Sequence, residues 1–479
     1  MKKYSTIILV SMFLSVSLSS EIFSQTDAPI LGDPYSESLP LKKEDAIGLA
    51  LYRNLQSYNY IDNNPLISSY INYLGNKLSR NLLDQDRQYN FFVVKSNQIN
   101  AFAVPGGYIG LNSGLIKLTK NEAQLAGVVS HEIAHIKLRH SAEMIASSRS
   151  NSIPMWVGII SGLFAGNAQA SMAAIKAGIG LSSQMNINLV RSNEIDADNY
   201  AIEIMQRSNY DILEMSNFFD SMENSTGEIQ REISYLYTHP MYENRIANIQ
   251  NKAGNQKSSQ KNSTDDYFFV KNIIEVNNIK DINREISSLR SNDLLTLHRL
   301  ALLYFKKSDY KNAIKHLKNI EDNKKANLYT SILHAKVLSS DNKIDEAIAI
   351  LNNLKKIYPL NKTVSFTLLE ILIENNIKPD YTENLIQSLG NQYMLNPDYL
   401  RLVSKFYTHK NNKYLSSIYL SDFYALMSDP NMAIEVLNNS MQSSKINTIQ
   451  REILSKKKLD IICSNPRPLE PIFGEKTCN

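Results

Sequence analysis

The stretch Val128-Val-Ser-His131-Glu132-Ile-Ala-His135-Ile136 places an H-E-x-x-H motif inside an apolar run with helical spacing. On a helix, His131 and His135 lie one turn apart on the same face, where both imidazoles can bind one metal ion. A carboxylate at Glu132 can then accept a proton from a metal-activated water. The alternative is a helix with two surface histidines and a solvated glutamate, so other parts of the chain must support the metal site.

The length of 479 residues exceeds what one hydrophobic core serves and indicates about two or three domains. The hydrophobic fraction of 43% is typical of a folded protein, and the net charge of +4 is spread along the sequence. That charge by itself argues neither for nor against nucleic-acid binding. Since no dense basic patch with interleaved aromatic residues occurs, we expect no nucleic-acid partner.

Residues 1–20 have the pattern of a secretory signal peptide. Lys2 and Lys3 form a charged start, and a mostly apolar run from Ile7 to Leu18 precedes small residues. A membrane anchor is the rival interpretation, but the apolar run is short for a bilayer span. We therefore expect an exported protein, which in a bacterial host means the periplasm.

The only two cysteines, Cys463 and Cys478, lie close together near the C-terminal end. In an exported protein such a pair forms a disulfide more often than it stays as two thiols. The bridge would close a short loop and stabilise the fold by about 3 kcal/mol. Two unpaired thiols in a frayed tail are the alternative.

A small β-sheet is expected ahead of the motif helix. Apolar residues at helical spacing predict two helices separated by Asn63-Asn64-Pro65, and Phe91–Val94 reads as a short strand. The segment Asn100–Leu111 reads as a strand, a Pro-Gly-Gly turn and a second strand, and Pro105 favours an edge or turn position. An edge strand can hold an extended peptide, or the hairpin only completes the core. Thr119, with Glu122 three residues later, resembles a capping box, so we expect the motif helix to begin near Lys120.

The segment 153–182 contains two apolar runs interrupted by polar residues. The first run is too short to cross a bilayer, and Asn167, Gln169 and Lys176 weaken the interpretation as a transmembrane hairpin. We expect an insertion whose apolar face covers the active site or makes a peripheral contact with a membrane or a barrel protein. Plain core helices are the alternative.

Two carboxylates follow at helical spacing. Glu194 and Asp198 lie one turn apart on one face, which suits one metal ligand and one group that orients a metal-binding histidine. Further on, His239 precedes Pro240. A histidine there is usually exposed, but near a metal it can gate the site, bind transiently or stabilise an oxyanion. Arg245 either pairs with a carboxylate of the site or only caps the fold.

His140 does not provide a third histidine ligand. The H-E-x-x-H-x-x-G-x-x-H zinc pattern needs Gly three residues and His six residues after the second histidine. Leu138 occupies the glycine position, and His140 comes one residue too early. We interpret His140 as structural or exposed.

Residues 251–266 form a polar linker, and helical hairpins are expected from 267 to 479. Leu300, Ala301, Tyr304, Ala313 and Leu317 have the spacing of a tetratricopeptide unit, and Ala347 lies 34 residues after Ala313. A degenerate copy runs through Leu420, Tyr424, Ala433 and Leu437. The period favours a solenoid with a concave binding face, with generic helical hairpins as the alternative.

Together these motifs resemble the gluzincin metalloproteases that include HtpX and the CAAX prenyl endopeptidases. The resemblance rests on His131-Glu132-Ile-Ala-His135, on Glu194-Ile-Asp-Ala-Asp198 and on His239-Pro240 with Arg245. The exported branch of the family, with C-terminal tetratricopeptide repeats, is the most similar. It implies a mainly α protein: a zincin-like α+β protease domain with a small sheet over residues 40–250, followed by an all-α tetratricopeptide-repeat solenoid.

The resemblance also implies roles for single residues. His131, His135 and Glu194 would hold one Zn²⁺, and Glu132 would be the general base. Asp198 would orient a metal-binding histidine. His239 would occupy the open zinc position in a resting, self-inhibited state.

The implied substrates are unfolded or stalled outer-membrane β-barrel proteins, and the implied docking partner of the repeats is the barrel-assembly machinery. The rival hypothesis is a chaperone or adaptor whose repeats bind barrel proteins while the protease site is largely silent. A third hypothesis is a membrane protease that uses 153–182 as spans. The intact Glu132 favours an enzyme.

Overall fold

The computed structural model describes residues 39–80, 82, 87–147, 187–225, 233–241, 244–254 and 263–464. The expected signal peptide (1–20) and the expected insertion (153–182) lie outside these residues. Among the helices that are described, none is long and apolar enough to cross a bilayer.

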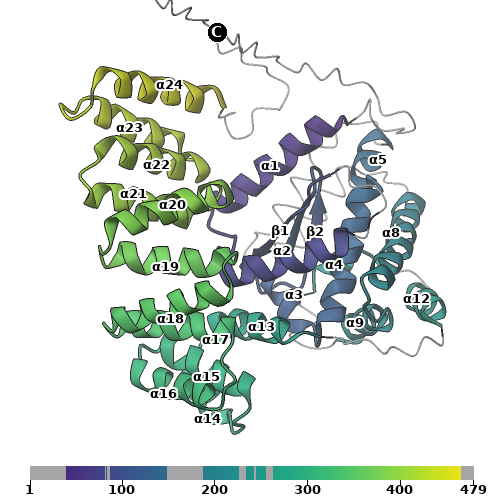
Figure 1. Cartoon of the computed structure of the whole chain (residues 1–479). Helices are drawn as coiled ribbons and strands as arrows, with labels where there is room; N and C mark the ends of the chain where they lie inside the picture. Colours follow the sequence, from purple (N-terminus) through teal and green to yellow (C-terminus); the bar gives the residue numbers. More distant parts are fainter. Residues whose placement is uncertain are drawn as a thin grey trace, which may run out of the picture.

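The described residues form a mixed part, in which one small sheet is seen, and a second part that is built only of helices within residues 263–464 (Figure 1). This confirms the fold class expected from the sequence. The helices of the mixed part are α1 (Leu41–Ser57), α2 (Pro65–Ser79), α3 (Ser113–Leu118), α4 (Glu122–Lys137), α5 (His140–Ser147), α8 (Ile187–Arg207), α9 (Leu213–Glu223), α11 (Tyr235–Thr238) and α12 (Arg245–Ala253).

The sheet holds β1 (Asn90–Val94), β2 (Ala101–Val104) and β3 (Tyr108–Asn112) in the order β1-β3-β2. β1 runs parallel to β3, and β2 runs antiparallel to it. The turn between β2 and β3 needs glycine, because Gly106 has φ +84° and a Cβ there would lie 2.7 Å from the carbonyl oxygen of Glu44. The predicted strand-turn-strand is therefore present, with β2 at an edge of the sheet and against α4.

Helix α4, which carries the H-E-x-x-H motif, is buried along nearly its whole length. It packs against α2, α8 and α9, and Gly127 lets the Met215 side chain of α9 approach closely. The predicted capping box is wrong. The N-cap is Asn121, whose side chain accepts from the Gln124 amide, while Thr119 ends α3 and donates its hydroxyl to Ile116. The short helix α3 lies between β3 and α4, and α4 therefore begins at Glu122.

The second part is a stack of antiparallel helices (Figure 1). Its members are α13 (Asp265–Asn278), α14 (Ile282–Ser288), α15 (Leu294–Lys306), α16 (Tyr310–Asp322), α17 (Leu328–Ser340), α18 (Ile344–Ile357), α19 (Lys362–Glu374), α20 (Pro379–Tyr393), α21 (Pro397–His409), α22 (Lys413–Leu426), α23 (Pro430–Met441) and α24 (Thr448–Ser464). The two residues that set the 34-residue spacing, Ala313 in α16 and Ala347 in α18, are both fully buried. The assignment of these pairs as tetratricopeptide units stays a prediction.

Helices occupy both ends of the range 251–266 that the sequence suggested as a linker. α12 continues to Ala253 and α13 begins at Asp265. Farther along, Cys463 in the last turn of α24 is disulfide-bonded, in keeping with the predicted pair. The only other cysteine of the sequence, Cys478, lies outside the described residues.

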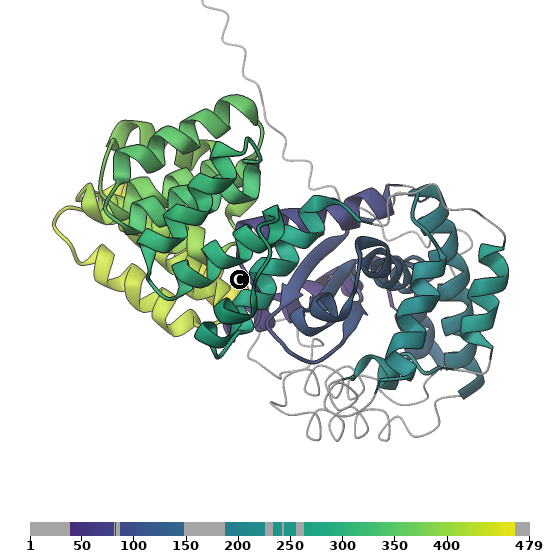
Figure 2. The same cartoon turned by 90° about the horizontal axis from the view of Figure 1, so that it is seen from below.

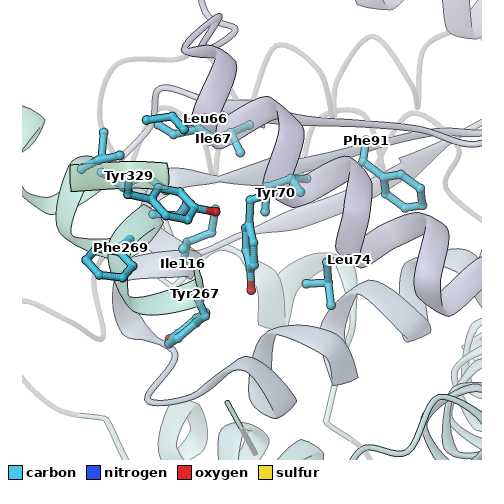
Figure 3. Close-up of a cluster of buried hydrophobic side chains, with 14 of the residues drawn as sticks. Leu66, Ile67, Tyr70, Leu74, Phe91, Ile116, Tyr267, Phe269 and Tyr329 are labelled. Carbon is cyan, nitrogen blue, oxygen red and sulfur yellow. The ribbon is translucent and has the colours of Figure 1, made fainter. Parts of the chain in front are cut away.

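The two parts share one hydrophobic core. Seen from below, the stacked helices lie beside the sheet and its helices (Figure 2), and α2 contacts both α13 and α19. Figure 3 shows the side chains that meet at this junction: Leu66, Ile67, Tyr70 and Leu74 of α2, Ile116 of α3, Tyr267 and Phe269 of α13, and Tyr329 of α17. Because these side chains are buried together, the helical stack is fixed against the part that carries the motif.

Candidate metal centre

Helices α4 and α8 bring the three ligands predicted from the sequence together around one point. The Nε2 atoms of His131 and His135 are 2.9 Å apart, as expected for two residues one helical turn apart. From α8, one carboxylate oxygen of Glu194 lies 3.3 Å from Nε2 of His131, and the other lies 3.3 Å from Nε2 of His135. His131 and Glu194 are buried, and the His135 side chain is 13% exposed.

His239, which follows the short helix α11, completes a group of four. Its Nδ1 lies 3.3 Å from Nε2 of His131 and 3.0 Å from Oε1 of Glu194. The four residues each offer one ligand atom, and all of these atoms lie within 4.8 Å of one another. His239 is buried at 7% exposure, which excludes the interpretation of an exposed histidine before a proline.

The donor set fits a metal ion. Tetrahedral Zn²⁺ with bonds of about 2.0–2.1 Å to N or O has ligand atoms about 3.3 Å apart, and the separations above are 2.9–3.3 Å. Several nitrogen and oxygen lone pairs that converge in a buried place repel one another unless a cation lies between them. These side chains can therefore hold a metal ion.

Glu132 lies beside this group and is fully buried. Its Oε1 is 3.4 Å from Nε2 of His239, but the geometry there is too poor for a hydrogen bond. Neither carboxylate oxygen has a hydrogen-bond partner among the described residues. Burial raises the pKa of Glu132, although the nearby His131 and His135 oppose the shift. A buried carboxylate with this raised proton affinity is suited to accept a proton from a reacting molecule.

Asp198 and Arg245 contact the candidate ligands His131 and Glu194. Oδ1 of Asp198 is 3.0 Å from Nδ1 of His131, so the carboxylate faces the ring nitrogen opposite the metal position. Arg245 donates to Asp198 through Nε at 2.6 Å and through Nη2 at 2.9 Å. Its Nη1 lies 2.9 Å from Oε2 of Glu194. Of the two interpretations of Arg245, pairing with the carboxylates of the site is the one that the structure shows.

The charges of the site offset the cost of burial. Desolvation alone would raise the pKa of Glu194, but His239, Arg245 and His131 hold it well below its ordinary value. Desolvation alone would lower the pKa of His131, but Glu194 and Asp198 raise it to about 9. Without a metal the site therefore attracts a proton, and a metal cation would take the place of that positive charge.

Two residues of the site were not predicted. His140 is buried, which leaves the structural one of its two interpretations, and its Nδ1 lies 2.8 Å from Nδ1 of His135. Tyr235 is fully buried, and its ring stacks on that of His239 with centroids 4.5 Å apart. A histidine five residues after the motif was visible in the sequence, whereas nothing in the sequence marked Tyr235.

Comparison with known proteins gives a match to one family model and to several curated relatives. Residues 66–253 match Peptidase family M48. The chain is 32% identical over 245 residues to the Beta-barrel assembly-enhancing protease of Yersinia pestis, covering 51% of this chain and 50% of that protein. The protein of the same name from Escherichia coli K12 is 31% identical over the same length and shares. The Mitochondrial metalloendopeptidase OMA1 of Schizosaccharomyces pombe is 28% identical over 165 residues, which cover 34% of this chain and 47% of that protein.

The chain thus spans about half the length of the curated relatives it matches. The matched range runs from α2 through α12 and includes all four residues of the metal-binding group. Sequence similarity and geometry therefore agree on the same segment. Residues 66–253 of this chain are therefore similar to peptidase family M48.

Proposed function

We propose that the chain is a zinc-dependent endopeptidase. The observation that carries the proposal is the convergence of His131, His135 and Glu194 beside the buried carboxylate of Glu132, which lacks a hydrogen-bond partner within the described part of the chain. Two histidines and a glutamate are a ligand set typical of catalytic zinc, which keeps one position open. When bound, zinc would polarise the scissile carbonyl and make the attacking water more acidic.

The residues of the chain have separate roles in the proposed reaction. Glu132 accepts the proton of the attacking water and then delivers it to the leaving amine. Asp198 fixes the ring of His131, and Arg245 neutralises the buried carboxylates. The edge strand β2, which lies against α4, holds the substrate extended through main-chain hydrogen bonds. His239 leaves its place near Glu132 to admit the water and the substrate.

The proposed substrates are unfolded or stalled outer-membrane β-barrel proteins in the periplasm. Support comes from the similarity to two proteins named Beta-barrel assembly-enhancing protease. The helical stack of residues 265–464 would dock on the barrel-assembly machinery, because stacked helix pairs present extended binding surfaces.

A second candidate function is that of a chaperone or adaptor with a largely silent protease site. One observation favours it: Nδ1 of His239 lies 3.0 Å from Glu194 and 3.3 Å from His131, in the place where the open metal position is expected. In this arrangement the site is closed to substrate. Both functions are compatible if a partner displaces His239.

The test compares the purified protein with its Glu132→Gln variant in zinc content and in cleavage of an unfolded protein such as casein. We expect about one zinc per chain in both, and cleavage only in the parent. The Glu203→Gln variant, at a partly exposed position of α8, serves as the matched control and should cleave like the parent. Full cleavage by Glu132→Gln would contradict the proposed mechanism. A parent protein that binds zinc and unfolded barrel proteins but cleaves neither them nor casein would favour the adaptor.

A further inference from the structure

The second histidine of the motif has an imidazole partner. Nδ1 of His135 lies 2.8 Å from Nδ1 of His140, and the two rings meet edge to face with centroids 4.9 Å apart and planes at 77°. His140 is only 5% exposed. Two ring nitrogens at this distance form a hydrogen bond, in which one donates and the other accepts.

The direction of this hydrogen bond follows from the metal site. Nε2 of His135 points at Nε2 of His131 and at Glu194, so it must present a lone pair when a metal is bound. The proton of the neutral ring of His135 is then on Nδ1, which donates to Nδ1 of His140. His140 must therefore be the acceptor, with its own proton on Nε2.

The position of His140 is set by the turn between α4 and α5. Helix α4 ends at Lys137, Arg139 adopts a left-handed conformation with φ +55°, and α5 begins at the next residue, His140. Arg139 is held by Glu44 of α1 through Nε at 3.0 Å and Nη2 at 2.8 Å, and it also donates to the carbonyl of Leu39.

Glu44 links this turn to the sheet. It is buried at 2% exposure and also pairs with Arg87. The turn glycine Gly106 packs against the Glu44 backbone and donates to the Glu44 carboxylate from its own amide. The strained residue Arg139 is thus held by Glu44, which is itself held by the turn between β2 and β3. Such support is the condition under which a left-handed non-glycine residue persists.

The two histidines of the motif consequently have different partners. His131 faces the carboxylate of Asp198, whereas His135 faces a neutral imidazole. A carboxylate makes its histidine more basic and adds a negative charge, while an imidazole only fixes the tautomer and the ring plane. The site already contains the buried carboxylates of Glu132, Glu194 and Asp198, so a neutral acceptor avoids a further unpaired charge.

We propose that His140 is a positioning residue, whose Nδ1 accepts the hydrogen bond that holds His135 in its metal-binding tautomer and orientation. The inference rests on the proposed zinc site. It extends the metal centre to a residue outside the H-E-x-x-H motif, and it predicts an effect on metal affinity that is separate from folding.

The experiment measures zinc affinity by competition with a chromophoric chelator, using full-length protein at pH 7.5. His140→Leu fills the space of the imidazole but offers His135 no hydrogen-bond acceptor. His140→Asn restores one, because its Oδ1 takes nearly the place of Nδ1. His298→Leu removes a buried histidine of α15, remote from the site in sequence, and is the matched control. Thermal unfolding of each metal-free protein gives a second readout.

We expect His140→Leu to bind zinc about 10- to 100-fold more weakly than the parent, with His140→Asn and His298→Leu close to parental affinity. The visible spectrum of the Co²⁺-loaded protein should change in His140→Leu and not in His298→Leu. Parental zinc affinity in His140→Leu would overturn the inference. So would an equal loss in His140→Leu and His140→Asn together with a lower unfolding temperature of the metal-free proteins, since that marks a purely structural residue. If the parent itself binds no zinc, the proposed function fails instead.

Discussion

Oδ1 of Asp198 lies 3.0 Å from Nδ1 of His131, on the side of the ring that faces away from the metal-binding group. The same carboxylate accepts two hydrogen bonds from Arg245. The carboxylate therefore fixes the tautomer of His131, and the arginine fixes the carboxylate. In the proposed metal site, the acidic helix α8 would have two functions within one turn: Glu194 would bind the metal, and Asp198 would orient His131.

Replacement of Asp198 by Asn keeps the shape of the side chain but removes its charge. We expect Asp198→Asn to lower zinc affinity about 10- to 100-fold, because the ring of His131 loses its charged acceptor. Chelator competition measures the change, and Asp196→Asn on the exposed side of α8 is the matched control. Equal zinc affinity in Asp198→Asn and Asp196→Asn would show that the contact with His131 does not tune the metal.

Arg245 should be important for stability when no metal is present. Its side chain is 3% exposed, and its removal leaves Glu194 and Asp198 buried without their cation. We expect Arg245→Met to destabilise the metal-free protein by about 3 kcal/mol, as measured by urea unfolding. Arg207→Met, which removes a partly exposed i,i+4 pair with Glu203, should cost less than about 1 kcal/mol. Zinc should reduce the deficit of Arg245→Met, because the ion supplies positive charge to Glu194.

His239 should limit activity in the resting protein. Its imidazole contacts Glu194 through Nδ1 and lies 3.4 Å from Glu132 through Nε2, so in the proposed mechanism this ring must move before a substrate reaches the metal position. Removing the ring raises the competent fraction, and we expect His239→Ala to increase kcat/KM about threefold or more. Peptide cleavage by this variant is compared with that of His409→Ala, an exposed histidine of α21. A loss of cleavage in His239→Ala alone would show that this histidine takes part in the chemistry.

Local periodicity explains which parts of the site could be predicted. The spacing of His131 and His135, and that of Glu194 and Asp198, places each pair on one helix face whatever the rest of the chain does. The role of His140 could not be read in the same way. It depends on the left-handed conformation of Arg139, a residue type that rarely adopts it, and on the partner Glu44 from a distant helix.

The same distinction applies to the fold. The strand-turn-strand around Pro105-Gly106-Gly107 and the helical hairpins follow from residue types and period. The junction between the two parts depends on contacts between residues far apart in the sequence. Thr264, just before α13, donates to Glu122 at the start of α4, 142 residues earlier. No local pattern indicates such a pair.

This junction is a testable link between the helical stack and the motif helix. Glu122 is buried and also accepts from the hydroxyls of Tyr70, at 3.1 Å, and Tyr210, at 2.6 Å. Thr264→Val removes a hydrogen bond to a charged group and the N-cap of α13, so we expect about 2–4 kcal/mol of destabilisation. The exposed Thr408→Val variant should stay within about 0.5 kcal/mol of the parent. Urea unfolding checks both, and an unchanged midpoint in Thr264→Val would mean that this link contributes nothing.

The pH dependence of stability should depend on His298 in α15. This side chain is fully buried, and neither ring nitrogen has a hydrogen-bond partner among the residues that the structure describes. Burial lowers its pKa to about 3. The folded state therefore keeps the ring neutral at pH values where the unfolded chain, with a pKa of about 6.5, binds a proton.

The sign of the effect follows from this difference. Above about pH 6.5 the ring is neutral in both states and has no effect on stability. Below it the unfolded state gains protons that the folded state does not, so stability falls by up to about 1.4 kcal/mol per pH unit until pH approaches 3. His298→Leu should remove this part of the slope, so the parent should lose about 1–2 kcal/mol more than the variant between pH 6.5 and 5. Urea unfolding at both pH values measures it, with His409→Leu expected to keep the slope of the parent. Parallel slopes for the parent and His298→Leu would show that the buried ring finds a proton-stabilising partner in the folded state.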